Sequence, residues 1–169
     1  ADEDHSPLEP VSTYGASKLA GEALIASYCH MFGLRGRAFR FGNVVGPRQT
    51  GAYGMVLPRF VDSALAGQPL VVHDDGQQIR CFAHVKDVVA AIVALMECST
   101  AVGRVFNIGS DQPVTILQLA QKVIELTGSK SQVEFQTYTA AYDKDFEDIR
   151  RRVPDLSRLR ETVDCPQPS

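Results

Sequence analysis

The sequence predicts an α/β fold in which strands pair in parallel. Segments with apolar side chains at helical spacing alternate along the chain with short apolar runs that are typical of buried strands. Glycine follows several of these segments, where helix ends and turns need it. The chain has 169 residues, 44% of them hydrophobic, which is enough to bury a core of ordinary size. Strands that alternate with helices are typical of sheets with parallel neighbours.

A helix and a strand open the chain in this prediction. Small and apolar side chains recur at helical spacing over residues 12–31, and Gly33 stands where a C-terminal cap is expected. The apolar run over residues 36–45, rich in phenylalanine and valine, is typical of a strand buried in a parallel sheet. A glycine-rich loop follows over residues 46–54. We place a domain boundary near Gly46, because the sheet-like part gives way there to loops that carry arginine.

The rest of the chain repeats the alternation. The same patterns predict, in chain order, a helix over residues 56–66, an extended segment over 69–72, a helix over 88–97, a strand over 105–108, a helix over 115–127, a strand over 133–135 and a short helix over 156–162. Gly128 stands where the third of these helices needs its C-terminal cap. These alternating elements support the α/β assignment.

The charge pattern favours a small-molecule ligand over a polymer or a membrane. The net charge is −3, from 17 basic and 20 acidic residues that are mixed along the chain. No stripe of one sign indicates binding to nucleic acid or to an anionic membrane. The longest apolar stretch, residues 88–96, is far shorter than the ~20 residues that cross a bilayer. We therefore expect no nucleic-acid partner and no membrane partner.

The cysteines indicate neither a metal site nor a disulfide framework. The four are Cys29, Cys81, Cys98 and Cys165, and they show neither close pairing nor the spacing of metal ligands. Such a set is typical of a protein from a reducing compartment. We therefore expect no bound metal and a cytoplasmic location.

Tyr14 and Lys18 are the first candidate catalytic residues. They stand four residues apart in the first predicted helix, so their side chains lie on one face of it. A free phenol titrates near ~10, and a neighbouring ammonium group favours its ionised form, which makes tyrosine usable as a general acid or base nearer neutrality. The spacing alone is more typical of an ordinary pair on an amphipathic surface.

Longer motifs surround this pair and continue through the chain. They are PVSTYGASKLAGE at residues 10–22, RFGNVVGPR at 40–48, DGQQIRCFAHVKD at 75–87, FNIG at 106–109 and FEDIRRRVPD at 146–155. Together these motifs closely resemble those of the NAD-dependent sugar-nucleotide epimerases and dehydratases, which are extended short-chain dehydrogenases.

The resemblance implies how the fold is divided. It implies part of a Rossmann-type parallel sheet, namely its C-terminal part, together with a small α/β domain that binds a sugar nucleotide. Residues 1–45 would belong to the NAD-binding domain and carry the Tyr-x-x-x-Lys helix. Residues 46–169 would form mainly the substrate domain, with 88–110 returning to the Rossmann sheet.

The resemblance also implies a role for each matching residue near the cofactor. Tyr14 would be the proton shuttle, and Lys18 would hold the nicotinamide ribose. The backbone around Phe41 and Gly42 would border the nicotinamide ring.

A second set of matching positions would bind the substrate. Asn43 would meet the diphosphate of the nucleoside-diphosphate sugar. The positions that would line the nucleoside are Val56, Leu57, Val72 and His73, and those that would grip the diphosphate and its ribose are Arg80, Arg152 and Asp155.

Several of these residues also have simpler interpretations, and the sequence leaves both open. Asn43 could cap a turn, and His73 could be a half-exposed strand residue. Arg80 could form a structural ion pair with Asp75 or Asp87, and the arginine run that ends at Arg152 could be a solvated face. An acidic residue is frequent in the family at the position of Glu3, but an acidic loop explains it equally well.

The chain also departs from the family pattern. Cys81 stands where an acidic residue is usual, Lys86 where a second aspartate is common, and Asp74 where glycine is usual. No glycine-rich loop joins a strand to a helix N-terminus, which is where the family holds the cofactor's pyrophosphate. We therefore expect the sequence to be a fragment whose cofactor loop lies upstream of Ala1.

The resemblance implies NAD-dependent oxidation of a sugar nucleotide, and a UDP-linked sugar is the one that we expect. A transient keto-sugar would then be reduced on its other face, dehydrated or decarboxylated. A homodimer through the region of the Tyr14–Lys18 helix is also implied. The alternative is a non-catalytic module that binds sugar nucleotides and lacks the cofactor loop.

Overall fold

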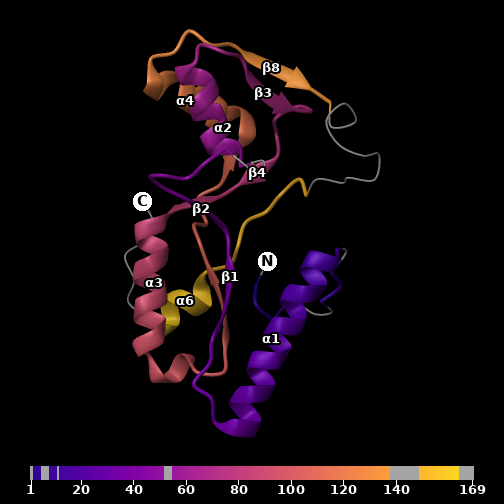
Figure 1. The fold of residues 1–169 in the computed structure, drawn as a ribbon, viewed down its shortest axis with the longest axis vertical. Helices are drawn as coiled ribbons and strands as arrows, with labels where there is room; N and C mark the ends of the chain where they lie inside the picture. The colour runs from indigo at the N-terminus through magenta and orange to yellow at the C-terminus, as the bar shows by residue number, and fades with distance from the viewer. Residues whose placement is uncertain (1, 5–7, 11, 52–54, 138–148, 164–169) are drawn as a thin grey trace. The chain divides into compact units, whose positions relative to one another are not determined.

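The computed structural model describes residues 2–4, 8–10, 12–51, 55–137 and 149–163 (Figure 1). The chain divides into two compact units. Unit 1 consists of Ala1–Val44, Phe82–Asp111 and Pro154–Ser169, and unit 2 consists of Val45–Cys81 and Gln112–Val153. Each unit therefore draws on segments that are distant in the sequence.

Unit 1 is built around a pair of parallel strands. Its elements are α1 (Thr13–Phe32), β1 (Ala38–Phe41), β2 (Asn43–Val45, ending at the unit boundary), β5 (Phe82–His84), α3 (Val85–Glu97), the 3-10 turn η2 (Ser99–Ala101), β6 (Val105–Ile108) and α6 (Ser157–Thr162). Strand β1 pairs in parallel with β6, with Arg40 opposite Asn107 and Phe41 opposite Ile108. Strand β2 pairs with β5.

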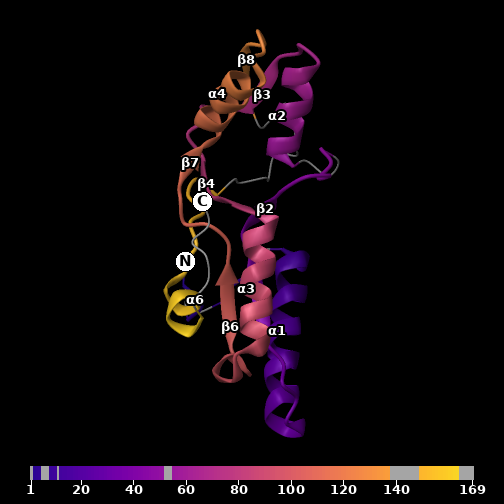
Figure 2. The ribbon, with the colours of Figure 1, turned by 90° about the vertical axis from the view of Figure 1, so that its left-hand side faces the viewer.

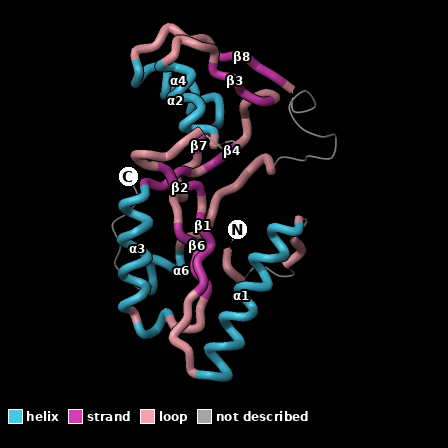
Figure 3. The backbone as a smooth tube through the Cα atoms, viewed as in Figure 1, coloured by secondary structure: helices cyan, strands magenta, loops and turns pink. Residues whose placement is uncertain are grey.

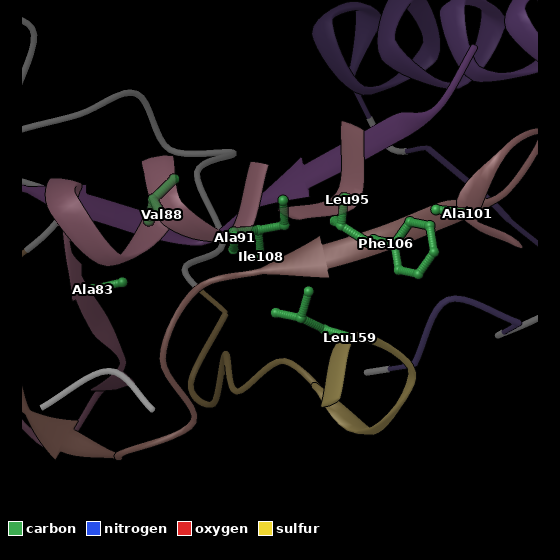
Figure 4. Close-up of a cluster of buried hydrophobic side chains, with 8 residues drawn as sticks. All are labelled: Ala83, Val88, Ala91, Leu95, Ala101, Phe106, Ile108 and Leu159. Carbon is green, nitrogen blue, oxygen red and sulfur yellow. The ribbon is translucent and has the colours of Figure 1, made fainter. Parts of the chain in front are cut away.

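The core of unit 1 lies along β6. Figure 2 shows β6 between helices α3 and α6. Apolar side chains of α3, η2 and β6 meet Leu159 of α6 there, as Figure 4 shows. The buried members of this cluster are Ala83, Val88, Ala91, Leu95, Ala101, Phe106, Ile108 and Leu159.

Helix α1 is held locally at both ends and contributes nothing to the buried core. The Ser12 hydroxyl accepts a hydrogen bond from the Gly15 amide at 3.1 Å, which caps the N-terminus. Gly33 ends the helix in the left-handed conformation with φ 66°. None of the 20 residues of the helix is buried.

Unit 2 packs two helices on a second pair of parallel strands. Its elements are α2 (Val56–Leu65), β3 (Leu70–His73), β4 (Ile79–Arg80), β7 (Val114–Thr115), α4 (Ile116–Thr127) and β8 (Val133–Gln136). Strands β3 and β8 pair in parallel, and α2 and α4 cover one face of the pair (Figure 3). The buried core consists of Phe60, Ala64, Leu70, Val72, Ala120 and Val123.

A second group of strands in unit 2 carries two of the predicted site residues. Strand β4 pairs antiparallel with β7, with Ile79 opposite Thr115. On its other side Ile79 forms a parallel bridge with Arg151. The Ile79 amide donates to the Arg150 carbonyl at 2.8 Å, and the Arg152 amide donates to the Ile79 carbonyl at 3.1 Å. The arginine run thus lies in register beside β4.

The α/β fold with parallel pairing is confirmed, one predicted strand needs correction, and three short strands were not predicted. The strand expected over residues 36–45 is two strands, because the chain changes partner at Gly42: β1 pairs with β6, and β2 with β5. The antiparallel pair of β4 and β7 was not expected. Strands β4, β5 and β7 are only two or three residues long, too short for a periodic pattern to predict them.

Candidate functional site

Helix α1 brings Tyr14 and Lys18 together. The Lys18 ammonium nitrogen lies 5.1 Å from the centre of the Tyr14 ring, within the range of a cation–π contact. The Tyr14 side chain is open to solvent, with 71% of the residue exposed. The two residues therefore form a close and accessible pair, as their spacing predicts.

One turn further along α1, Glu22 is tied to strand β1. The Arg40 guanidinium donates to both Glu22 carboxylate oxygens, from Nε at 2.8 Å and from a terminal nitrogen at 2.7 Å. This two-pronged ion pair is largely shielded from solvent, with side-chain exposures of 26% for Arg40 and 19% for Glu22. The hydrogen bond to Glu22 raises the pKa of Arg40, so the guanidinium keeps its charge. Arg40 directly precedes Phe41 and Gly42 at the end of β1.

The segment before α1 is tied to the same sheet through Glu3. The Glu3 carbonyl accepts from Arg40 at 3.3 Å. The Glu3 carboxylate is buried and accepts from the Asn107 backbone amide of β6 at 2.8 Å. Arg158 of α6 donates to the Val105 carbonyl at 3.0 Å and pairs with Asp4, whose pKa it lowers. The structure thus gives Glu3 a specific contact, unlike a generic acidic loop.

The carboxyl ends of β1 and β6 form a bare stretch of backbone. The Gly42 amide donates to the Ile108 carbonyl at 2.9 Å, which extends the ladder past the end of β1. A Cβ atom built on Gly109 would lie 3.5 Å from the Gly42 Cα, so the two glycines are direct neighbours. The side chain of Phe41 is 49% exposed beside them. Ligands of open α/β sheets bind outside the carboxyl ends of the strands.

The side chains of Arg80 and Arg152 lie on the same face of β4 and the segment beside it. Ile79 lies opposite Arg151 in a parallel register, so Arg80 lies opposite Arg152. Side chains alternate between the two faces of a strand, so Arg151 points to the other face. Arg80 also donates to the Ile149 carbonyl at 2.7 Å, which ties its side chain to the arginine segment.

The acidic neighbour of Arg80 has another partner. Asp75 pairs with Arg150 at 2.8 Å, and this contact lowers the pKa of the Asp75 carboxyl. Arg150, Arg151 and Arg152 are all exposed. The arginine run is therefore a solvated segment in this structure, and one of its members forms a specific ion pair.

The residues predicted to line the nucleoside differ in exposure. Val72 is fully buried in the core of unit 2, so its side chain does not face solvent. Val56 and Leu57 are half-buried and pack against the same core. His73 is the half-buried last residue of β3. Val72 could therefore contact a ligand only through its backbone.

Asn43 and Asp155 belong to unit 1. Asn43 is the half-buried first residue of β2. The Asp155 carboxylate accepts from the Ser157 amide at 2.8 Å at the start of α6. The Ser157 hydroxyl, followed by this amide, lowers the pKa of Asp155. The Asp155 carbonyl accepts from the Asn107 side chain at 3.1 Å. Asp155 thus has a local structural role beside any contact with substrate.

Other polar residues of the motifs have structural roles. The His84 ring caps α3 by accepting from the Lys86 amide at 3.2 Å. Asp74 has a φ of 51°, the left-handed region that glycine adopts most readily, which accounts for the glycine usual at this position. Cys81 is buried.

The described residues lack two kinds of feature. No group of histidine, cysteine, aspartate and glutamate side chains there could hold a metal ion. In that same part of the chain, every helix is too short or too polar to cross a bilayer. Cys29, Cys81 and Cys98 are free thiols, and Cys165 lies outside the described residues.

Sequence reasoning assigned no role to Glu22 and Arg40, although both stand in the quoted motifs. Their charges are visible in the sequence, but they are 18 residues apart, and nothing local pairs them. The available signal was spacing, since Glu22 continues the four-residue row of Tyr14 and Lys18.

Comparison with known proteins gives close relatives over most of the chain. It is 37% identical over 150 residues to a UDP-N-acetyl-alpha-D-glucosaminuronate decarboxylase of Bacillus cytotoxicus, which covers 88% of this chain and 46% of the relative. It is 34% identical over 158 residues to UDP-glucuronic acid decarboxylase 1 of Arabidopsis thaliana, covering 94% of this chain and 34% of the relative. The chain thus spans less than half the length of these two curated relatives.

Solved structures show the same likeness. A UDP-glucose 4-epimerase from Thermotoga maritima, solved with UDP-glucose, superposes with a TM-score of 0.87 at 29% identity, covering 100% of this chain and 52% of that one. A UDP-glucuronic acid 4-epimerase from Bacillus cereus, solved with UDP-glucuronic acid and NAD, gives 0.84 at 27% identity, with coverages of 99% and 51%.

A family model matches residues 1–109, which is more than half of the chain and includes Tyr14, Lys18 and the Gly42–Gly109 contact. The chain therefore belongs to the NAD-dependent epimerase/dehydratase family.

Proposed function

We propose that the protein containing this chain is an NAD-dependent enzyme that oxidises a UDP-linked sugar to a transient keto-sugar. The observation that carries the proposal is the pair on α1, where the Lys18 ammonium lies 5.1 Å from the ring of an exposed tyrosine. The family match supports it, because the matched residues 1–109 include both members of the pair.

The residues of unit 1 fit the nicotinamide end of the cofactor. Tyr14 and Lys18 are exposed and offer a hydroxyl and an ammonium group for ribose hydroxyls. Gly42 and Gly109 face one another at the carboxyl ends of parallel strands, the edge outside which ligands of open α/β sheets bind. When bound, NAD supplies the acceptor for the hydride that leaves the sugar.

Proton transfer would be the work of Tyr14. Its phenol oxygen would take the proton of the sugar hydroxyl as the carbon is oxidised, and would return it when the keto group is reduced. Lys18 would hold the ribose by hydrogen bonds from its ammonium group. The solvent-exposed position of Tyr14 leaves room for a substrate to reach its oxygen.

Substrate binding in unit 2 would depend on Arg80 and Arg152. The backbone register supports this proposal, because it puts the two residues opposite one another. Guanidinium groups bind diphosphate oxygens by charge-assisted hydrogen bonds. Within unit 2, the further contacts that we propose for the nucleotide are His73, Val56, Leu57 and the Val72 backbone. The roles of Asn43 and Asp155 stay predictions from the sequence.

The relatives favour one outcome for the keto-sugar. Two relatives at 34% and 37% identity are named as decarboxylases of UDP-linked uronic acids. We therefore propose a UDP-linked uronic acid as substrate and loss of its carboxylate as carbon dioxide, which makes the enzyme a lyase. Epimerisation, the activity named for the solved relatives, is the second candidate.

The test is turnover of UDP-glucuronate with NAD, followed by chromatography of the nucleotide products. We expect a UDP-pentose and carbon dioxide, the products of decarboxylation. UDP-galacturonate as the product would support epimerisation instead. Binding of UDP-glucuronate without either product, in a protein that also fails to bind NAD, would support a non-catalytic binding module. No binding of any UDP-linked sugar would reject both.

We also propose that the enzyme is a cytoplasmic homodimer that pairs through α1. Large apolar side chains are exposed along this helix, and besides Tyr14 they are Leu24, Tyr28, Met31 and Phe32. An isolated helix surface of this kind is typical of a contact site. Light scattering on the protein and on a Met31→Glu variant tests the dimer, and cell fractionation tests the location.

A further inference from the structure

Polar contacts join α1 to the sheet of unit 1. None of the residues of the helix is fully buried, and Glu22 belongs to its half-buried face together with Leu19 and Ile25. Its middle is joined to β1 by the two-pronged contact from Arg40 to Glu22. Arg40 in turn donates to the carbonyl of Glu3, whose carboxylate is fixed by the Asn107 amide of β6. Glu22 is thus attached to both strands of the sheet.

Lys18 stands between two possible partners on this helix. Tyr14, Lys18 and Glu22 are spaced by four residues, so the three side chains form one row. A lysine and a glutamate at this spacing attract one another on a helix surface. In this structure the Lys18 ammonium lies at the Tyr14 ring, and both oxygens of Glu22 are occupied by Arg40.

We propose that Arg40 is a positioning residue for the Tyr14–Lys18 pair, because it occupies the Glu22 carboxylate and so keeps Lys18 beside Tyr14. The inference rests on the proposed function only for its consequence in catalysis. The guanidinium suits the task, since its planar fork matches both carboxylate oxygens at once, and an ammonium group does not. Without Arg40, the negative charge of Glu22 would draw Lys18 away from the phenol.

The Arg40→Gln variant and the Arg40→Gln/Glu22→Gln double variant should differ in the position of Lys18. If Arg40 had a merely structural role, both variants would give the same result. Arg40→Gln frees the Glu22 carboxylate, so Lys18 should leave the Tyr14 ring. The Arg40→Gln/Glu22→Gln double variant has no carboxylate at position 22, so Lys18 should return to the Tyr14 ring. Glu22→Gln alone should leave Lys18 beside Tyr14. This variant can be measured in place of the Arg40 variants if those fold poorly.

The measurement is the NMR shift of the Lys18 methylene protons next to the ammonium group, assigned with a Lys18→Arg variant. Protons near an aromatic ring face are shifted upfield by the ring current. We expect this upfield shift in the unmodified chain, its loss in Arg40→Gln, and its recovery in the double variant. Glu125→Gln, which removes the exposed partner of Lys122 on α4, is the matched control and should change nothing at Lys18.

Two results would overturn the inference. One is an unchanged Lys18 signal in Arg40→Gln, and the other is a double variant that loses the shift as completely as the single one. In the enzyme, Arg40→Gln should lower kcat by ~10- to 100-fold with little change in the KM for the UDP-sugar, because displacing a catalytic group by about 1 Å can cost that much. If the Lys18 signal behaves as expected while Tyr14→Phe leaves turnover intact, the proposed function fails and the inference on Lys18 stands.

Discussion

Helices α1 and α4 have the same local ends but differ in what holds their faces. Both have a hydroxyl cap at the N-terminus, from Ser12 and Thr115, and both end at a left-handed glycine, Gly33 and Gly128. Helix α4 buries Ala120 and Val123 in the core of unit 2, whereas α1 buries no residue. Helix propensity and caps can thus form a helix, but only packing or specific polar contacts decide which way its side chains face.

The difference matters because the helix with no buried residue carries the proposed chemistry. The residues of α1 are free to serve a ligand, since none is committed to a core. The same freedom makes their placement sensitive to single polar contacts such as that between Arg40 and Glu22. In unit 2, by contrast, backbone hydrogen bonds beside β4 fix the register of the arginine segment.

The largest effect should come from the phenol oxygen on α1. In the enzyme, Tyr14→Phe removes the group that transfers the proton, a contribution of ~10²- to 10⁴-fold. We expect turnover to fall by this factor while the affinity for the UDP-sugar is nearly unchanged, which steady-state kinetics and calorimetry can measure. Turnover within a few-fold of the unmodified enzyme would reject the role of Tyr14.

The next effect concerns the arginine segment of unit 2. Arg152→Ala should weaken UDP-sugar binding by ~1.5 to 3 kcal/mol, the usual range for hydrogen bonds to charged groups, with NAD binding unchanged. Arg151 is the matched control, because its side chain leaves the opposite face of the strand. Equal losses for Arg151→Ala and Arg152→Ala in calorimetric titrations would indicate a diffuse basic surface and defeat the clamp.

A matched pair of substitutions compares the two helices directly. Ala120→Leu adds three carbons to a fully buried position of α4 and should destabilise the protein by ~1 to 3 kcal/mol, the usual cost of overpacking. Ala26→Leu makes the same change at an exposed position of α1 and should stay within about 0.5 kcal/mol. Urea unfolding measures both free energies. A comparable loss for Ala26→Leu would mean that α1 is packed as tightly as α4.

Sequence reasoning succeeded where structure is set locally. Helix α4 was predicted over residues 115–127 and lies at Ile116–Thr127, because its period, its Thr115 cap and its Gly128 cap are all encoded nearby. The site pair on α1 followed from spacing in the same way.

Sequence reasoning failed where contacts between distant segments determine the structure. The break at Gly42 exists because β1 and β2 choose different partner strands, β6 and β5, and no local pattern reports that choice. Strand β4 forms by pairing with Thr115 and Arg151, which lie far along the chain. The partner of Glu22 likewise depends on where β1 lies beside α1.

The smallest effect should come from the exposed ion pair of unit 2. Asp75 and Arg150 have side-chain exposures of 50% and 68%, against 19% and 26% for Glu22 and Arg40, so water and salt screen the Asp75 pair far more. Arg150 lowers the pKa of Asp75 in the folded protein below its ordinary value of 3.8. The folded state therefore holds its proton less tightly than the unfolded state does. The contribution of Asp75 to stability is full above about pH 4 and is lost as the pH falls through the lowered pKa.

Asp75→Asn should accordingly cause a small loss of thermal stability at pH 7 that shrinks in 1 M salt and disappears at low pH. Scanning calorimetry of both proteins at pH 7 and near pH 2 measures the difference in Tm. A loss of the same size at both pH values would show that the Asp75 side chain acts through its hydrogen bond to the Gln77 amide, which asparagine partly keeps, and not through its charge. A pH-dependent loss as large as that of Glu22→Gln would contradict the ranking of the two ion pairs by exposure.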